Sequence, residues 1–231
     1  MNNGNTDLQE PSFLWLIAED GWPLLALAGL LTILLTILFV PLGTFSLGLL
    51  VWLAHVLRIP ERKVPEAKNA IVAPADGRVI EIVTLEETDA FDQQAVLRIT
   101  IRTLLSDVQL QMAPIDGRIT DNFSIPGLFN SFKDMEAVRV YNERREITIT
   151  QDGGFCVVIV QLGGTLARQL ICRHHVGRSV KIGTPLSMTR LAGVVDLLVP
   201  ADCSPAITVG QHVLAGETIV ANRPSGERLS F

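Results

Sequence analysis

The chain has little cysteine and little positive charge, and each shortage argues against a class of protein. Three cysteines occur in 231 residues, without paired or metal-like spacing, so we expect neither a disulfide framework nor a cysteine metal site. The three are Cys156, Cys172 and Cys203, which we interpret as reduced core residues. Lysine and arginine total 19 against 24 aspartates and glutamates, and this acidic balance argues against a nucleic-acid partner, which requires a basic face.

Charged side chains are missing altogether from residues 21–57, where His55 is the only residue that could carry a charge. A spanning helix needs roughly 20 apolar residues, and this run is longer but is interrupted at Pro41–Gly43. We therefore predict a membrane segment, either a transmembrane helical hairpin or one spanning helix followed by an interfacial helix. A buried hairpin of a soluble protein is the less favoured alternative. The expected interface anchors are Trp15, Trp22 and Trp52.

Basic residues are also missing from the first 20 positions, which argues against a cleaved signal peptide. They follow the apolar run instead, beginning with Arg58, Arg62 and Lys63, and by the positive-inside rule they place the remaining chain in the cytoplasm. We predict four parts: a tail at 1–20, the inner-membrane segment at 21–57, a linker with two prolines at 58–70, and a cytoplasmic β-rich domain at 71–231.

Short runs rich in Val, Ile and Thr follow the linker and predict strands. The expected strands lie at 70–83, 96–104, 146–150, 154–162 and 195–200. Only LARQLICRH, at 166–174, has the pattern of a short helix. The fold class is therefore predicted as mainly β, a hybrid-barrel or sandwich domain preceded by the helical membrane segment.

Two pairs of segments repeat within this β-rich part. PADGRVIEI at 74–82 resembles PIDGRITDN at 114–122, and VGRSVKIGTPL at 176–186 resembles VGQHVLAGETI at 209–219. The glycines suit turns that need positive φ, and the second pattern is typical of lipoyl- and biotinyl-type barrels. A carrier role needs an exposed lysine at a hairpin tip, whereas Lys181 lies inside a repeat, so we expect the barrel geometry without that role.

Six motifs follow one another between about residues 20 and 222. In order they are the apolar run from EDGWPLL to RIPER, then VAPADGRV, SDVQLQMAPIDG, YNERRE, RLAGVVDLLVP and VGQHVLAGETIVA. Each motif alone is a weak signal, but in this order they resemble the short bacterial and archaeal phosphatidylserine decarboxylases.

The resemblance implies an all-β domain tethered to the inner membrane, which removes CO₂ from phosphatidylserine to give phosphatidylethanolamine. It also implies a pyruvoyl group as the electron sink for that decarboxylation. In the family this group arises from the chain itself, when a serine hydroxyl attacks the carbonyl of the preceding glycine and the resulting ester eliminates. The ketone then forms a Schiff base with the amine of the lipid.

The chain departs from the family pattern at the residues that would perform this chemistry. The family's Arg-Phe-Gly-Ser-Arg-Val-Asp corresponds to residues 190–196, with Ala192 in place of the cleavage glycine and Gly193 in place of the serine. Glycine has no side-chain nucleophile, so cleavage cannot begin at this bond. The family's histidine is replaced by Gln109, which cannot exchange a proton near neutral pH, and its arginine by Met112. We therefore predict that the pyruvoyl group is not formed.

Other family positions keep their residues. Asp76 stands at a catalytic position, and Asp196 closes the cleavage motif. The substrate-binding positions hold Asn142, Glu143 and Arg144. Arg144 is suited to hold a phosphate or carboxylate oxygen. Judged from the residues alone, the Asp-Gly pairs at Asp76 and Asp116 favour turn chemistry.

Two further patterns carry less weight. Gly163-Gly164-Thr165 resembles a self-cleaving Gly-Thr site, but capping of the helix expected at 166–174 explains Thr165 better. Cys172, His174 and His175 are metal ligands by type. Adjacent histidines in extended chain point to opposite faces, however, and no second cluster completes a four-ligand site. We predict no metal.

These observations predict a decarboxylase relative of phospholipid biosynthesis that is non-catalytic. It would bind phosphatidylserine or another anionic phospholipid at the membrane, or pair with a second copy or an active homologue. The alternative is a working decarboxylase, converting phosphatidylserine to phosphatidylethanolamine and CO₂, that is cleaved at another site. A third class is a structural membrane-anchored barrel without lipid specificity.

Overall fold

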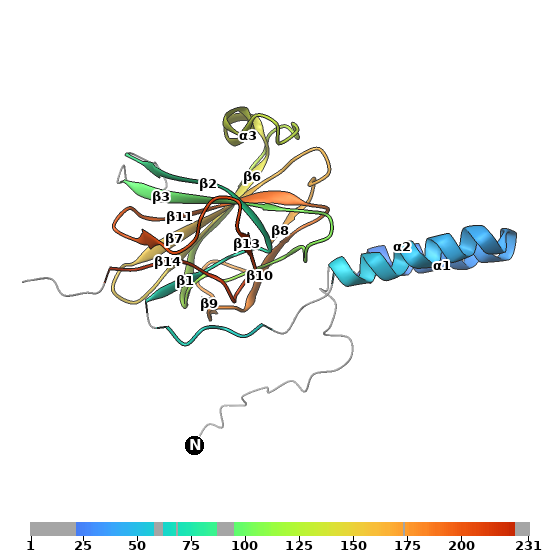
Figure 1. Cartoon of the computed structure of the whole chain (residues 1–231), viewed down its shortest axis with the longest axis horizontal. Helices are drawn as coiled ribbons and strands as arrows, with labels where there is room; N and C mark the ends of the chain where they lie inside the picture. The colour runs from blue at the N-terminus through green and yellow to red at the C-terminus, as the bar shows by residue number, and fades with distance from the viewer. Residues whose placement is uncertain (1–21, 58–61, 68, 87–94, 173, 225–231) are drawn as a thin grey trace, which may run out of the picture. The chain divides into compact units, whose positions relative to one another are not determined.

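The computed structural model describes residues 22–57, 62–67, 69–86, 95–172 and 174–224, and the chain divides into two compact units between Pro60 and Glu61 (Figure 1). The first unit contains the helices α1 (Trp22–Leu38) and α2 (Val40–Val56). The second contains α3 (Met135–Tyr141) and the strands β1 (Ala70–Val72), β2 (Gly77–Leu85), β3 (Val96–Thr103), β4 (Leu110–Met112), β5 (Gly117–Ile125), β6 (Arg144–Thr150), β7 (Cys156–Leu162), β8 (Leu170–Ile171), β9 (Ser179–Val180), β10 (Pro185–Thr189), β11 (Gly193–Pro200), β12 (Ser204–Pro205), β13 (His212–Val213) and β14 (Ile219–Asn222).

The two N-terminal helices form a hairpin around Phe39, whose backbone is extended, with a proline in the first turn of α2. Gly43 allows the helices to approach closely, because an added Cβ would lie 2.2 Å from Thr36 Oγ1. The hydroxyl groups of Thr32 and Thr36 are satisfied within α1, each donating to the carbonyl four residues earlier at 2.8 Å. Most of the large apolar side chains of the hairpin are exposed.

Neither helix reaches the length of a membrane span. Each has 17 residues, which make about 25 Å of helix against a hydrocarbon core of about 30 Å. Among the residues that the structure describes, no helix is both long and apolar enough to cross a bilayer. The predicted transmembrane hairpin is therefore not supported, because the break at Phe39 divides the apolar run into two short helices. Trp15 lies outside the described residues.

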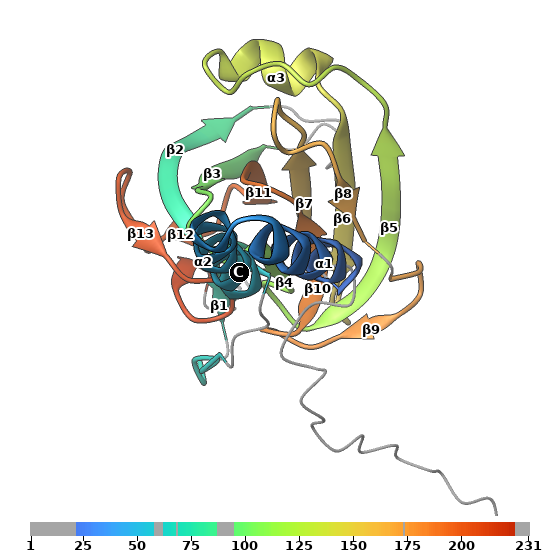
Figure 2. The ribbon, with the colours of Figure 1, turned by 90° about the vertical axis from the view of Figure 1, so that its right-hand side faces the viewer.

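The second unit is built on an eight-stranded antiparallel sheet, ordered β13-β2-β3-β11-β7-β6-β5-β9, that curls into a half barrel (Figure 2). Two three-stranded sheets, β1-β14-β12 and β4-β10-β8, share one hydrophobic core with it. Alternation along the strands directs one set of apolar side chains into this core. Its members include Ile71, Ile99, Ile101, Ile119, Ile147, Ile159, Leu186, Leu197 and Val220. On the other face of the long sheet, Val138 of α3 packs with Val158 and Val194.

The mainly β prediction is confirmed, and each expected strand is present within a few residues. The segment at 70–83 is split into β1 and β2 by the Asp-Gly turn. The helix expected at 166–174 is wrong: Leu170 and Ile171 instead form β8 and pair with Thr189 and Met188 of β10. The helix that does form, α3, was not predicted. It is short and is capped at its N-terminus by Asp134, whose carboxylate accepts from Ala137 N at 3.2 Å.

The sequence repeats correspond to two structurally matched halves. Val72 N donates to Pro114 O at 3.0 Å, and Met112 N donates to Pro74 O at 2.8 Å, so equivalent residues exchange bonds between the halves. The later repeats match as well: Gly183 and Gly216 have φ of 75° and 74°, and Gly177 and Gly210 have φ of 93° and 91°. The expectation of a shared turn geometry is confirmed at these positions.

Candidate functional site

The position that the resemblance assigns to the cleavage bond lies where β11 begins. Gly193 pairs with Thr103 of β3, and the preceding Ala192 N–H donates to Gln109 Oε1 at 2.7 Å. Gln109 Nε2 donates in turn to Leu104 O at 3.0 Å and Asp107 O at 2.8 Å. The structure thus brings Gln109, Ala192 and Gly193 together, as the resemblance implies. Both the oxygen and the nitrogen of the Gln109 amide therefore form hydrogen bonds with backbone groups.

The backbone ahead of Gly193 is strained. Leu191 and Ala192 have φ of 63° and 65°, and among the described residues they are the only ones other than glycine with positive φ. A left-handed conformation costs an L-residue roughly 1–2 kcal/mol. The family's glycine would adopt it without this cost, so Ala192 keeps the turn of the cleavage motif although it lacks the residue that suits it.

We expect Ala192→Gly to raise the free energy of unfolding by about 0.5–1 kcal/mol, since strain relief exceeds the entropy that glycine adds to the unfolded chain. Urea denaturation measures this change. Ala206 is a matched control, because it is exposed and does not have positive φ. Ala206→Gly should lower stability by a similar amount. A loss of stability in both variants would contradict the strain at Ala192.

The space beside Gly193 is already occupied. A Cβ added at Gly193 would lie 2.8 Å from Thr189 Cγ2 and 3.8 Å from Ala167 Cβ. The first distance is too short for carbon atoms in contact, so a serine here requires Thr189 to move. The Thr189 methyl group therefore fills the volume in which a residue-193 side chain would begin.

Thr189 belongs to a buried cluster of neutral polar groups. It consists of Gln111, Gln161, Ser187 and Thr189, none of which is more than 6% exposed. Gln111 Nε2 donates to Thr189 Oγ1 at 2.8 Å, Ser187 Oγ donates to Gln111 Oε1 at 2.7 Å, and Gln161 Nε2 contacts Gln111 Oε1. Amides and hydroxyls bond well to one another but do not exchange protons near neutral pH. This cluster provides no general base for the cleavage bond.

Asp76 and Asp116 have the same role in the two repeat halves. Asp76 Oδ1 accepts from Ala215 N at 2.7 Å, and Asp116 Oδ1 accepts from Ile182 N at 2.8 Å. Each acceptor thus fixes the turn just ahead of a glycine with positive φ, Gly216 or Gly183. Both bonds join segments distant in sequence, which the local turn chemistry expected of the Asp-Gly pairs does not describe.

Asp76 differs from its counterpart because it also binds a buried cation. Arg62 donates to both carboxylate oxygens, at 2.8 and 2.6 Å, and the two side chains are only 9% and 5% exposed. Burial raises the pKa of Asp76, while the Ala215 N–H and the Arg62 charge oppose that rise. Thr103, the partner of Gly193, donates to Asp76 O at 2.8 Å. Asp76 therefore lies beside the cleavage position, with its carboxylate already engaged.

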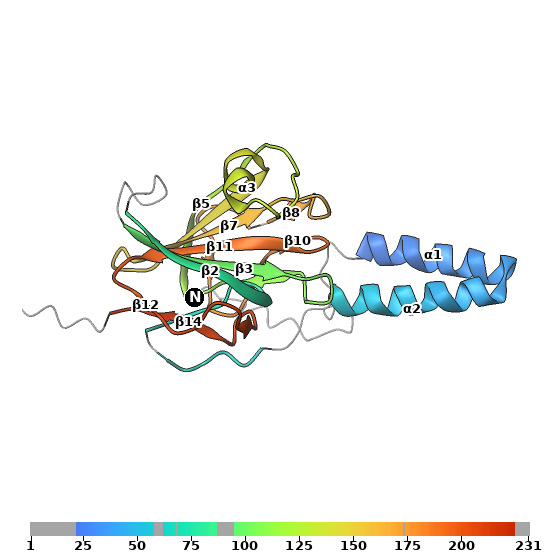
Figure 3. The same cartoon turned by 45° about the horizontal axis from the view of Figure 1, so that its top comes forward.

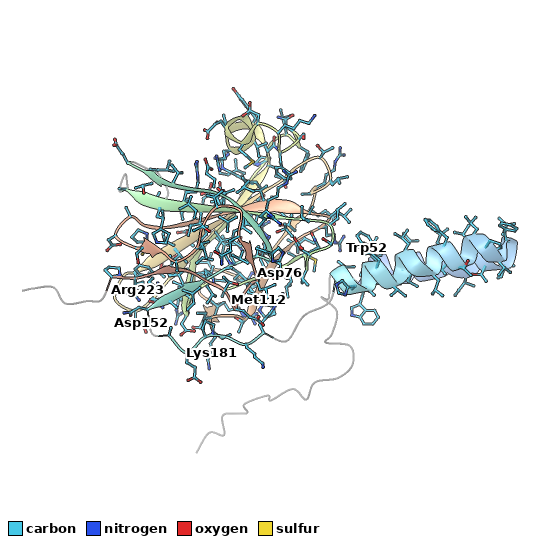
Figure 4. All side chains as sticks on the ribbon, viewed as in Figure 1. Trp52, Asp76, Met112, Asp152, Lys181 and Arg223 are labelled. Atoms are coloured by element: carbon cyan, nitrogen blue, oxygen red, sulfur yellow. The ribbon has the colours of Figure 1, made fainter. Side chains whose placement is uncertain are left out.

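Met112 lies near this ion pair and not against Gly193. Its sulfur would be 2.9 Å from a Cβ added at Gly216, and that Cβ would also lie 3.2 Å from Gly183 Cα and 3.6 Å from Arg62 Cβ. Figure 4 shows Asp76 and Met112 in the same part of the β domain. A guanidinium at position 112 would therefore enter the surroundings of Arg62.

Asn142 and Arg144 have different environments. Asn142 is 1% exposed; its amide donates to Asn130 O at 3.0 Å and to Gly163 O at 2.8 Å, so it joins two loops. Arg144 is partly exposed and pairs with Glu146 at 3.0 Å. Glu143, between them, bonds through its backbone to Leu128 and Gly163.

The strand register places Arg144 at the Gly193 end of the sheet. Arg144 is opposite Leu162 of β7, and Leu162 is opposite Val194 of β11. Two strand spacings, about 10 Å, therefore separate Arg144 from the residue after Gly193.

The two weaker patterns acquire structural explanations. Thr165 caps no helix; its hydroxyl donates to Phe129 O at 3.3 Å, so the expected capping role is wrong. Cys172 Sγ accepts from Asn122 Nδ2 at 3.4 Å, and burial raises the pKa of its thiol. His174 Nε2 bonds Pro185 O at 2.9 Å. Within the described ranges, no group of three or more metal-binding side chains is found.

Asp196 belongs to an ion network that the sequence did not reveal. Thr100 Oγ1 donates to Asp196 Oδ1 at 2.6 Å, and Arg139 Nε donates to Asp196 Oδ2 at 2.9 Å. Arg139 also binds Glu81; burial raises the pKa of that carboxyl, but the hydrogen bond and charge of Arg139 outweigh burial and lower it. Asp196 thus anchors α3 to the sheet. Arg139 carries no sequence signal, because it meets Asp196 only through the packing of α3.

Comparisons with known proteins identify the chain's relatives. A family model described as phosphatidylserine decarboxylase matches residues 49–221. A phosphatidylserine decarboxylase proenzyme of Mycobacterium avium is 39% identical over 173 residues, covering 74% of this chain and 72% of the relative. Proenzymes of the same name from Geotalea uraniireducens and Symbiobacterium thermophilum are each 30% identical, covering 90% and 95% of this chain and 97% and 99% of the relatives.

Proposed function

The chain belongs to the phosphatidylserine decarboxylase family, and on that premise we propose that it is a non-catalytic member that binds phosphatidylserine or another anionic phospholipid at the membrane. The family is pyruvoyl-dependent, and formation of that group requires a nucleophile in the chain at the cleavage bond. The proposal therefore depends first on what stands at residues 192 and 193.

The observation that carries the proposal is the environment of Gly193. Gly193 has no side-chain oxygen, and the Thr189 methyl group occupies the space where a side chain would begin. The neighbouring Ala192 N–H is held by Gln109, an amide that cannot serve as a base near neutral pH. The residues present do not fit the formation of a pyruvoyl group at this bond.

Lipid association is supported by the N-terminal hairpin and by Arg144, a partly exposed cation at the Gly193 end of the sheet. Residues 22–57 contain no Asp, Glu, Lys or Arg, and the hairpin exposes apolar side chains on most of its surface. Such a hairpin is stabilised by insertion into the apolar part of a lipid layer, which does not require either helix to span it. We propose the inner membrane as the site, with the β domain on its cytoplasmic side. A second copy or an active homologue is the proposed protein partner.

We expect the purified full chain to float with vesicles that contain phosphatidylserine and to release no CO₂ from carboxyl-labelled phosphatidylserine. Arg144→Ala should reduce the preference for phosphatidylserine over phosphatidylcholine about three- to fivefold, because one cation near an anionic surface contributes about 1 kcal/mol. Arg118→Ala is the matched control. Arg118 lies near the start of β5, opposite Thr150, whereas Arg144 lies opposite Ile125 at the end of β5. Release of labelled CO₂, or equal effects of the two substitutions, would contradict the proposal.

A further inference from the structure

Three loops that meet at one end of the β domain carry exposed leucines. They are residues 104–109, 163–169 and 190–192, and we call them together the leucine end. Resting on the proposed function, we infer that the leucine end docks directly onto a bilayer surface that contains anionic phospholipid, in addition to any attachment by the N-terminal hairpin.

Contacts around Gly193 bring the three loops together. The Gln109 side chain bonds both Leu104 O and Ala192 N, and so joins the first loop to the third. Ala167, of the second loop, lies with its Cβ 3.8 Å from a Cβ added at Gly193. Figure 3 shows β3, which leads into the first loop, beside β11, which leads out of the third, and the register pairs the two strands.

Each loop exposes leucine although its backbone is fixed. Leu104 is 48% exposed, Leu105 39%, Leu166 58% and Leu191 38%. Neighbouring residues of the same loops, such as Val108 and Ala167, are buried. Single exposed apolar residues are common, but four on three converging loops form a patch of the kind that marks an interaction site. The leucines therefore point outward from a rigid support.

Arginines lie on these loops and on the strand ends next to them. Arg168 and Arg190 lie on the loops themselves, each within two residues of an exposed leucine. The strand register adds Arg78, Arg102 and Arg144, which occupy one row across the sheet with Val194.

Acidic groups at this end are fewer, and three of the four are engaged with neighbouring groups. Asp107 Oδ2 accepts from Leu104 N at 2.8 Å, Glu146 pairs with Arg144 at 3.0 Å, and Asp76 pairs with Arg62 at 2.6 Å. Glu143 is the fourth. With Arg62 included, six arginines therefore face four carboxylates at the leucine end, whereas acidic residues exceed basic ones, 24 to 19, in the whole chain.

This combination favours an anionic bilayer over a second copy of the chain. Apolar tips with a cationic border are the arrangement by which interfacial proteins insert between acidic headgroups. A symmetric contact between two copies would place the same end against itself and bring arginines against arginines. The anionic bilayer is the partner that complements both the leucines and the charge.

The inference is tested by placing an environment-sensitive fluorophore on the full chain at Leu166→Cys or at Val176→Cys. The two sites are matched in exposure, at 58% and 59%. Val176 lies at the opposite end of the sheet: Gly177 N bonds Ile119 O, and the register carries Ile119 across β6 and β7 to the Pro200 end of β11. The unsubstituted chain, treated with the same label, gives the background from the native thiols.

We expect vesicles with phosphatidylserine to shift the emission of the Leu166→Cys label to the blue, and to leave the Val176→Cys label unchanged. Phosphatidylcholine vesicles should give a smaller shift. If the chain floats with the vesicles but the label at residue 166 stays in water, the inference is overturned while lipid association stands. If the chain does not float at all, the proposed function fails first. Equal shifts at both sites would also overturn the inference. So would a blue shift of the Leu166→Cys label that appears without vesicles when the protein concentration is raised, since it would indicate contact between copies of the chain.

Discussion

Arg62→Ala is expected to lower the free energy of unfolding by about 3–5 kcal/mol, because it leaves a buried carboxylate without its cation. Arg62 and Asp76 are 9% and 5% exposed, and both Asp76 oxygens lie within 2.8 Å of the guanidinium. The same contact holds residues 62–67 on the β domain, where Lys63 N also bonds Glu217. Urea denaturation of the variant and the unsubstituted chain measures the loss.

Asp116→Ala is the matched control for this prediction. Asp116 makes the same bond in the second repeat half, to Ile182 N at 2.8 Å, but it is exposed. Its loss should cost only about 1 kcal/mol, as for one ordinary hydrogen bond. Equal losses in the two variants would contradict the importance of the ion pair.

The pH dependence of the Arg62→Ala variant follows from the Asp76 carboxyl. Burial already raises its pKa, and loss of the cation should raise it further. A carboxyl whose pKa is higher in the folded chain than in the unfolded chain destabilises the fold once the unfolded chain can ionise it. This loss in the free energy of unfolding is absent below the ordinary pKa of about 3.9 and grows as pH rises towards the folded-state pKa. The variant should therefore recover part of its deficit on acidification. A deficit that does not depend on pH would contradict this assignment.

Gly193→Ser alone is expected to leave the chain uncleaved, although it restores the family's hydroxyl. The new Cβ would lie 2.8 Å from Thr189 Cγ2, so the serine cannot take its place without displacing Thr189. Ala192 would keep its strained φ of 65° and its bond to Gln109, and no base would be added. Denaturing electrophoresis of the purified variant should show a single band, as for the unsubstituted chain.

Cleavage is expected only when the surroundings are changed with the serine. The set Ala192→Gly, Gly193→Ser, Gln109→His and Thr189→Ala supplies the turn residue, the nucleophile, the base and the space. Met112→Arg is left out because position 112 faces Arg62 and Gly216, where a second cation would meet a buried one. The same set with Gly193→Ala in place of serine controls for altered folding and should remain whole. Cleavage of Gly193→Ser by itself would show that the site retains its chemistry.

The strands and turns were predictable because their signals are local. Val, Ile and Thr enrichment located strands such as β3 and β11, and the repeated Asp-Gly and Val-Gly patterns located matching turns. The helix expected at 166–174 was wrong because pairing of Ile171 with Met188 decides that segment. The apolar run at 21–57 predicted helices but not their length, which the break at Phe39 sets.

The candidate site was predictable only in part. The family motif brought Ala192, Gly193 and Gln109 into one hypothesis, and the structure places them in contact. The sequence did not point to Thr189 or Arg62 as site residues. Thr189 packs against Gly193 across a turn, and Arg62 pairs with Asp76 through the tertiary fold, and neither contact is part of a sequence motif. The same holds for the leucine end, whose three loops meet only in the fold.

The most direct test of the central claim, that no pyruvoyl group forms at Ala192-Gly193, is the intact mass of the purified, unsubstituted chain. We predict one unbroken species near 25.2 kDa. Two chains, the smaller with a blocked N-terminus, would contradict the account and show an active member of the family with another cleavage site.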